Sequence, residues 1–188
     1  MKDQPAAIEK GYYDIVKKVK AEIDIPLAVK LSPYFINLGQ VILNLEKEGA
    51  NAVVLFNRFA SPDIDIDKIK VTSAPPYSTP DEIYNSLRWI AMMSNRVQID
   101  LAASTGIHDG EAVIKQLLAG ASVVQVASAL YKHGASFLPA LLKFVDEWMT
   151  KNGFNYIDQF KGNLSQEEAS NPDVFERLQF MKYFSEIT

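Results

Sequence analysis

Four short apolar segments, each followed by a stretch with helical periodicity, limit what this chain can fold into. These segments are residues 27–31, 52–56, 97–102 and 122–127. Strands that are apolar on both faces are typical of a parallel sheet covered by helices, because both of its faces are then buried. The sequence therefore predicts an α/β fold in which parallel strands alternate with helices.

The segments between and around these strands have the apolar spacing of amphipathic helices. We expect helices at residues 7–23, 37–48, 80–95, 109–119, 134–151 and 172–186. Residues 57–79 are rich in Asp, Ser and Pro and are predicted to be mostly loop. The layout of Gly-Ala, a short turn and a valine-rich strand occurs twice, at 49–57 and 120–128. This spacing is typical of (β/α) barrel units, although Rossmann-like sheets use it too.

The composition excludes several classes of site and partner. The chain has no cysteine, which rules out disulfides, thiolate zinc sites, iron–sulfur clusters and a cysteine nucleophile. Its two histidines are too few for a histidine-rich metal site. Its formal net charge of −4 makes nucleic acid an unexpected partner. It also lacks an apolar run long enough to span a membrane. We therefore expect a soluble cytoplasmic protein with no membrane partner.

Two polar residues lie at the carboxyl ends of the first two strands. Parallel α/β folds bind their ligands at these ends. Lys30 stands at the end of an apolar strand, and a lysine buried there requires an anion or a carboxylate beside it. The alternative is a lysine that reaches solvent. Asn57 holds the equivalent position after the second strand and has an amide that can both donate to and accept from a planar heterocycle. The alternative is a residue that caps a turn.

The last two strands end in small residues. Ser104, Thr105 and Gly106 follow the third strand, and Ala127 and Ser128 follow the fourth. Small side chains let a ligand approach the backbone, and amides at such ends favour phosphate. Two consecutive ends of this kind predict a phosphate-binding site, although tight packing of helices on strands also selects small residues. His108 is expected to be a turn or surface residue rather than a base.

Together, these residues resemble the C-terminal half of dihydroorotate dehydrogenases, the FMN-dependent barrel enzymes of pyrimidine synthesis. The resemblance rests on four segments: PLAVKLSPYF (26–35), FNR (56–58), ASTGIHDGEAVIKQLLAGASVVQVASALYKHG (103–134) and IDQFKGNL (157–164). The third of these is the most specific. In two positions the chain departs from the family's usual glycine, with Thr105 in the first phosphate loop and Ala127 in the second.

The resemblance implies a fold, a cofactor and a reaction. The fold would be that of the (β/α)8 TIM-barrel family, of which this chain supplies about four βα units and a C-terminal helix. Lys30 would contact the N1/O2 edge of the flavin, and Asn57 would bind the pyrimidine substrate. The cofactor-binding set would be completed by Ser104, Thr105, Gly106, Ala127 and Ser128. The backbone amides of the last four would hold the FMN phosphate. The reaction would be oxidation of dihydroorotate to orotate.

A half barrel raises the question of what completes it. A closed barrel has eight strands and typically about 250 residues, whereas this chain has 188. The family's catalytic base lies upstream of the lysine strand, and nothing here matches it, so the isolated chain is expected to be inactive. We expect residues 1–164 to form the half barrel and 165–188 a helical appendage, with either self-association or a missing N-terminal half. The alternatives are a phosphate-binding barrel lyase or isomerase and an inactive half-barrel binding module.

Overall fold

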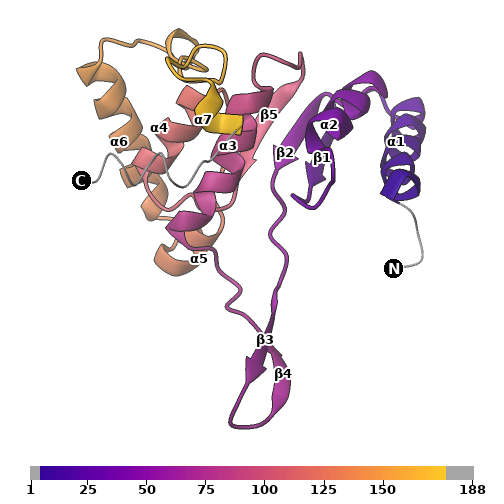
Figure 1. Cartoon of the computed structure of the whole chain (residues 1–188). Coiled ribbons are helices and arrows are strands. Elements are labelled where there is room, and N and C mark those ends of the chain that lie inside the picture. The colour runs from indigo at the N-terminus through magenta and orange to yellow at the C-terminus, as the bar shows by residue number, and fades with distance from the viewer. Residues whose placement is uncertain (1–4, 177–188) are drawn as a thin grey trace.

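The protein forms one four-stranded parallel sheet with helices packed against it. The computed structural model describes residues 5–176. The sheet has the strand order β1-β2-β5-β6 and consists of β1 (Ala28–Leu31), β2 (Ala52–Leu55), β5 (Asp100–Ser104) and β6 (Val123–Gln125) (Figure 1). Successive strands along the chain are therefore neighbours in the sheet. This sequential order is that of a barrel segment, whereas a Rossmann-like sheet reverses its strand order at a switch point.

The helices alternate with these strands as predicted. They are α1 (Pro5–Glu22), α2 (Leu38–Lys47), α3 (Ile83–Met93), α4 (Gly110–Ala119), α5 (Ser128–His133), α6 (Phe137–Lys151) and α7 (Asp173–Glu176), with 3₁₀ turns at Pro80–Glu82 and Ile157–Gln159. Side chains fix two helix starts: Asn37 accepts a hydrogen bond from the Gln40 amide at 3.2 Å, and Asp109 from the Ala112 amide at 2.7 Å. None of the helices within residues 5–176 combines the length and the hydropathy that crossing a membrane requires.

The two faces of the sheet have different environments. Residues of one parity, such as Leu31, Val53 and Leu101, are buried in a core that they share with α1, α2 and α3. Because side chains alternate along a strand, residues of the other parity lie on the opposite, inner face. On the edge strands these residues are exposed, as Lys30 and Val123 show. One face is therefore covered by helices, whereas the other is exposed along its edge strands and buried at its centre, at Val54 and Ala102.

Three segments differ from the predicted secondary structure, the first being the third strand, which was predicted at 97–102 and is found at Asp100–Ser104. The predicted loop 57–79 contains an antiparallel hairpin, β3 (Pro62–Asp65) and β4 (Lys70–Ser73), which projects from the body beyond β2 (Figure 1). The predicted single helix 134–151 is wrong in its start, because the chain forms α5 before Gly134 and starts α6 after it. Gly134 has a φ of +76°, which ends a helix.

Only the beginning of the predicted last helix can be compared with the structure. Within the predicted range 172–186, the structure has the short helix α7, and residues 177–188 lie outside the described part of the chain. This segment lies against α3, where the Phe175 carbonyl accepts a hydrogen bond of 2.5 Å from Arg88 Nε. The division of the chain at residue 164 stays a prediction.

Candidate functional site

The predicted site residues come together in one cavity at the carboxyl ends of the strands. The cavity has a volume of about 380 Å³. Its lining includes every residue that the sequence singled out for ligand binding: Lys30, Asn57, Ser104, Thr105, Gly106, Ala127 and Ser128. The four strands supply them in order, because the carboxyl ends of parallel strands meet at one edge of the sheet. Their individual roles stay predictions.

Lys30 reaches across the inner face of the sheet. Its Nζ donates hydrogen bonds to Ser104 Oγ at 3.3 Å and to Gln125 Oε1 at 3.2 Å. The first acceptor lies on β5 and the second on β6, at the opposite edge of the sheet. Lys30 is exposed rather than buried, and within residues 5–176 it has no carboxylate partner. Of the two alternatives, the lysine that reaches solvent is the one found, and its ammonium group meets two neutral oxygens.

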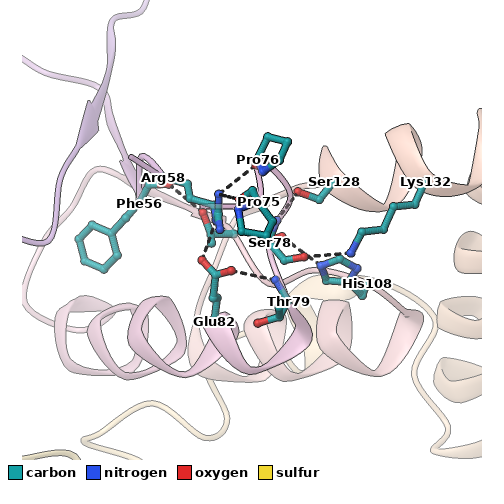
Figure 2. Close-up of polar contacts among 11 residues, drawn as sticks. Phe56, Arg58, Pro75, Pro76, Ser78, Thr79, Glu82, His108, Ser128 and Lys132 are labelled. Atoms are coloured by element: carbon teal, nitrogen blue, oxygen red, sulfur yellow. Dashed lines mark hydrogen bonds and ion pairs between the residues drawn. The ribbon is translucent and has the colours of Figure 1, made fainter. Parts of the chain in front are cut away.

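Arg58, which directly follows Asn57, is the second cation of the cavity lining. Its Nε donates to Glu82 Oε2 at 2.8 Å, and its Nη1 donates to the carbonyls of Pro75 and Pro76 at 3.2 and 2.9 Å (Figure 2). Burial by itself would raise the pKa of Glu82, but hydrogen bonds from Arg58 and from the Thr79 amide outweigh it and hold this pKa below its ordinary value. The two charges neutralise each other and tie the base of the hairpin to the turn before α3.

A smaller cavity adjoins the first on the other side of Arg58. Its volume is about 240 Å³, and it shares Asn57, Arg58, Ser104 and Thr105 with the larger cavity. Asn57 is exposed at this boundary, while its backbone amide donates to the Leu31 carbonyl at 2.7 Å. The side-chain amide of Asn57 is therefore available to a ligand in either cavity.

The loop after β5 has an unusual backbone. Thr105 and Gly106 have φ angles of +82° and +78°. This region is strained for a β-branched residue such as Thr105, whose Oγ1 donates to the Phe56 carbonyl at 3.2 Å. At Gly106 a Cβ would lie 2.2 Å from the Ile83 amide nitrogen. The first turn of α3 thus approaches the loop so closely that only glycine fits, and the loop presents backbone to the cavity.

Residues 75–79 pass beside α5 and are hydrogen-bonded to it. The Ser78 amide donates to Ser128 Oγ at 2.9 Å, and the Ser78 carbonyl accepts from Lys132 Nζ at 3.1 Å (Figure 2). Ser78 Oγ and His108 Nε2 share a hydrogen bond of 3.0 Å. Burial, together with the charge of Lys132, lowers the pKa of His108 and so favours its neutral imidazole.

Several residues of the site were missed by the sequence reasoning. Gln125 had a detectable signal, because it is a polar side chain within the valine-rich run 123–126. His108 lies in the loop before α4, in keeping with the expected turn or surface position, but it is half-buried against Ser78, and no local sequence feature indicates that contact. Tyr131, on α5, lines the cavity and lies with its ring centroid 5.8 Å from that of Tyr77.

Comparison with known proteins gives a family and a set of relatives. The family model for dihydroorotate dehydrogenase matches residues 4–149. Similar proteins include the catalytic subunit of dihydroorotate dehydrogenase B (NAD(+)) from Pyrococcus abyssi, which is 28% identical over 80% of this chain and 51% of its own length. The corresponding subunits from Caldicellulosiruptor saccharolyticus and Porphyromonas gingivalis are 26% and 28% identical, over 81% and 82% of this chain and 52% and 51% of theirs.

These comparisons confirm the predicted family and the predicted fold class. The chain spans about half the length of the curated relatives that it matches. Its four parallel strands in sequential order are accordingly part of a TIM barrel, with helices on one face and an inner face that is exposed along its edge strands. The family match covers all four strands of the sheet and the residues that line the cavity. The chain therefore belongs to the dihydroorotate dehydrogenase family.

Proposed function

We propose that this chain is the FMN-binding half of an enzyme that oxidises dihydroorotate to orotate in pyrimidine biosynthesis. The observation that carries the proposal is the convergence of residues from all four strand ends on one cavity. Family membership supports the reaction, because the relatives are named for it. The chemistry of the cavity supports the cofactor, because its lining combines the small residues at the ends of β5 and β6 with a cation, Lys30.

The phosphate of FMN would lie at the ends of β5 and β6. The backbone amides of Thr105, Gly106, Ala127 and Ser128 would donate to it, next to the hydroxyl of Ser104. The close approach of the Gly106 loop to α3 supports this role, because it holds the loop in place without a ligand. Backbone amides that are fixed before binding hold an anion without a further ordering cost.

Lys30 would act at the flavin ring. FMN, when bound, supplies the acceptor for a hydride from the substrate, and negative charge then grows on the ring. A fixed cation beside that charge stabilises the reduced form electrostatically. The two hydrogen bonds from Lys30 to Ser104 and Gln125 support this role, because they fix the ammonium group at the inner face.

Asn57 would hold the pyrimidine. Its side-chain amide can donate to a ring carbonyl and accept from a ring N–H, which suits a planar ring with alternating groups. The exposure of Asn57 at the boundary of the two cavities supports this role. Arg58, held by Glu82 and by two carbonyls, would keep the strand end in position.

The other half of the barrel would come from a second polypeptide segment or from self-association. Both edge strands, β1 and β6, lack a neighbour in the part of the sheet that the structure describes. The curated relatives are about twice as long as the matched region. A second set of four strands would close the sheet and cover the inner face, and it would supply the proton-transfer group that has no match here.

Anaerobic mixing of the FMN-loaded chain with dihydroorotate tests the proposal. Loss of the visible flavin absorbance would show transfer of reducing equivalents from substrate to cofactor. We expect FMN to bind this chain and its reduction by dihydroorotate to be slow, because the proton-transfer group belongs to the other half of the barrel. Lys30→Ala should slow this reduction by at least a further factor of about ten, because the cation beside the ring is lost. Lys70→Ala, on the exposed hairpin, is the matched control and should behave as the wild type.

Three other outcomes are informative. FMN that binds but is not reduced would identify the chain as a binding half that needs its complement for turnover. A chain that binds a sugar phosphate and no flavin would favour the barrel lyase or isomerase. Equal reduction by the wild type and Lys30→Ala would contradict the role of Lys30.

A further inference from the structure

We propose that Gln125 is a positioning residue that holds Lys30 in place without neutralising it, and thereby sets how strongly the cavity favours a reduced, negatively charged flavin. The inference rests on the proposed FMN site. It assigns to Gln125, on the edge strand β6, an effect on the charge that the site presents to the flavin.

The strand register explains how the two side chains meet. Lys30 pairs with Val54, and Val54 pairs with Ala102, so the three lie in one row across β1, β2 and β5. Gln125 pairs with Ser104, two residues further along β5 and on the same face. The lysine therefore crosses β2 and β5 to reach β6. The short side chains of Val54 and Ala102 leave room for its stem.

The chemistry of the acceptors decides what the contact does. Lys30 Nζ donates to an amide oxygen at 3.2 Å and to a hydroxyl oxygen at 3.3 Å. Neither acceptor carries a net charge, so the ammonium group is oriented but keeps its full positive charge. A carboxylate at either position would orient it equally well but would cancel that charge.

The other cation of the cavity lining shows the contrast. Arg58 is held by the carboxylate of Glu82, whose oxygen lies 2.8 Å from its Nε. Among the cavity-lining residues that the structure describes, Lys30 and Arg58 are the charged ones. The charge of Lys30 is therefore not neutralised by a carboxylate, unlike that of Arg58, and acts fully on a bound ligand. This arrangement assigns ligand stabilisation to Lys30 and structural support to Arg58.

Gln125→Glu is the direct test, because it is close to isosteric and differs by one charge. We expect the variant to retain FMN binding but to lose about tenfold in its preference for reduced over oxidised FMN, since a carboxylate would then lie beside the ammonium group. For a two-electron couple, this factor corresponds to a midpoint potential lower by about 30 mV. The measurement is a redox titration of the FMN-loaded chain.

Two further variants separate charge from structure. Thr72→Glu adds the same charge on the exposed strand β4 and should leave the potential at the wild-type value. Gln125→Met removes the acceptor but adds no charge. It should lower the potential by less than Gln125→Glu does, because Lys30 is then less well fixed beside the ring but keeps its full charge.

The outcomes distinguish the proposed FMN site from the role of Gln125. A wild-type chain that binds no FMN overturns the proposed function and this inference with it. A wild-type chain that binds FMN, together with a Gln125→Glu variant of unchanged potential, overturns the role of Gln125 alone. An equal fall in potential for Gln125→Glu and Thr72→Glu would also overturn it, because the effect would then be one of overall charge.

Discussion

At the scale of single residues, Gly106 carries the sharpest steric requirement in the site. A Cβ there would lie 2.2 Å from the Ile83 nitrogen and 2.6 Å from its Cα, and the φ of +78° is unfavourable for any other residue. We expect Gly106→Ala to lower the free energy of unfolding by about 2–4 kcal/mol, because both strain and overlap must be relieved. Denaturant unfolding measures the change.

Gly153 provides the control for this substitution. It has a φ of +76°, but a Cβ there meets nothing within 4 Å. Gly153→Ala should therefore cost only the backbone strain, about 1 kcal/mol. Equal losses in the two variants would show that the close approach of α3 to the phosphate loop does not contribute.

His108 gives the stability a pH dependence. Its pKa is lowered in the folded state, so between the folded and the unfolded pKa the unfolded chain binds more protons. The wild type should therefore lose stability as the pH falls below about 6.5, the ordinary histidine value. His108→Gln should lose less over the same range. Denaturant unfolding at about pH 7 and about pH 5 compares them, and identical slopes would contradict the assignment.

The sequence predicted which residues would line the cavity, because a residue at the carboxyl end of a parallel strand lies at the ligand-binding edge of the sheet. Lys30 and Asn57 follow the first two apolar runs, and parallel strands bring these ends together. Contacts made across the sheet were not predictable in the same way. The bond from Lys30 to Gln125 spans 95 residues and depends on the curvature of the sheet, and that of His108 with Ser78 depends on the path of a loop.

At the scale of elements, the hairpin β3–β4 has one apolar and one polar face. Ile64 pairs with Val71, so their side chains share a face, and both are exposed. Asp63 and Asp65 lie on the other face, because side chains alternate along a strand. The composition of residues 57–79 predicted a loop, because prolines flank the two short strands and leave no long apolar run.

The turn of this hairpin contains a backbone conformation that does not suit its residue. Ile69 has a φ of +49° and is exposed. We expect Ile69→Asn to slow amide exchange across residues 62–73 several-fold, because asparagine tolerates the left-handed region better than a β-branched residue. Ile66→Asn, also exposed, is the control and should not slow exchange. Faster exchange in Ile69→Asn would contradict the expectation.

The break between α5 and α6 shows a second limit of the sequence pattern. The sequence predicted a helix at 134–151 and no helix directly before Gly134. The phosphate-loop end at Ser128 starts α5 directly after β6, and Gly134 then ends it. The helix α6 packs on α4 instead, where Leu141 joins Val113 and Leu117 in a second core. Tertiary packing, rather than periodicity, sets this boundary.

At the scale of the whole molecule, the described sheet has two unpaired edges and an inner face that is exposed along its edge strands. Val123, on the edge strand β6, is 51% exposed on this face. Such surfaces favour pairing with another chain. We expect the isolated chain to self-associate as its concentration rises, and Val123→Lys to shift it toward the monomer. Sedimentation velocity measures this, with Tyr84→Lys on α3 as the control. A wild type that stays monomeric at every concentration would contradict this.

The most direct test of the flavin-binding site is the visible absorption spectrum of the purified chain. It is recorded before and after incubation with FMN, once free ligand has been removed. The site geometry predicts that the wild type retains about one flavin per chain. Lys30→Ala should retain less flavin, and Lys70→Ala should retain as much as the wild type. A chain that retains no flavin in either condition would contradict the claim that the strand ends of this half barrel form the FMN site.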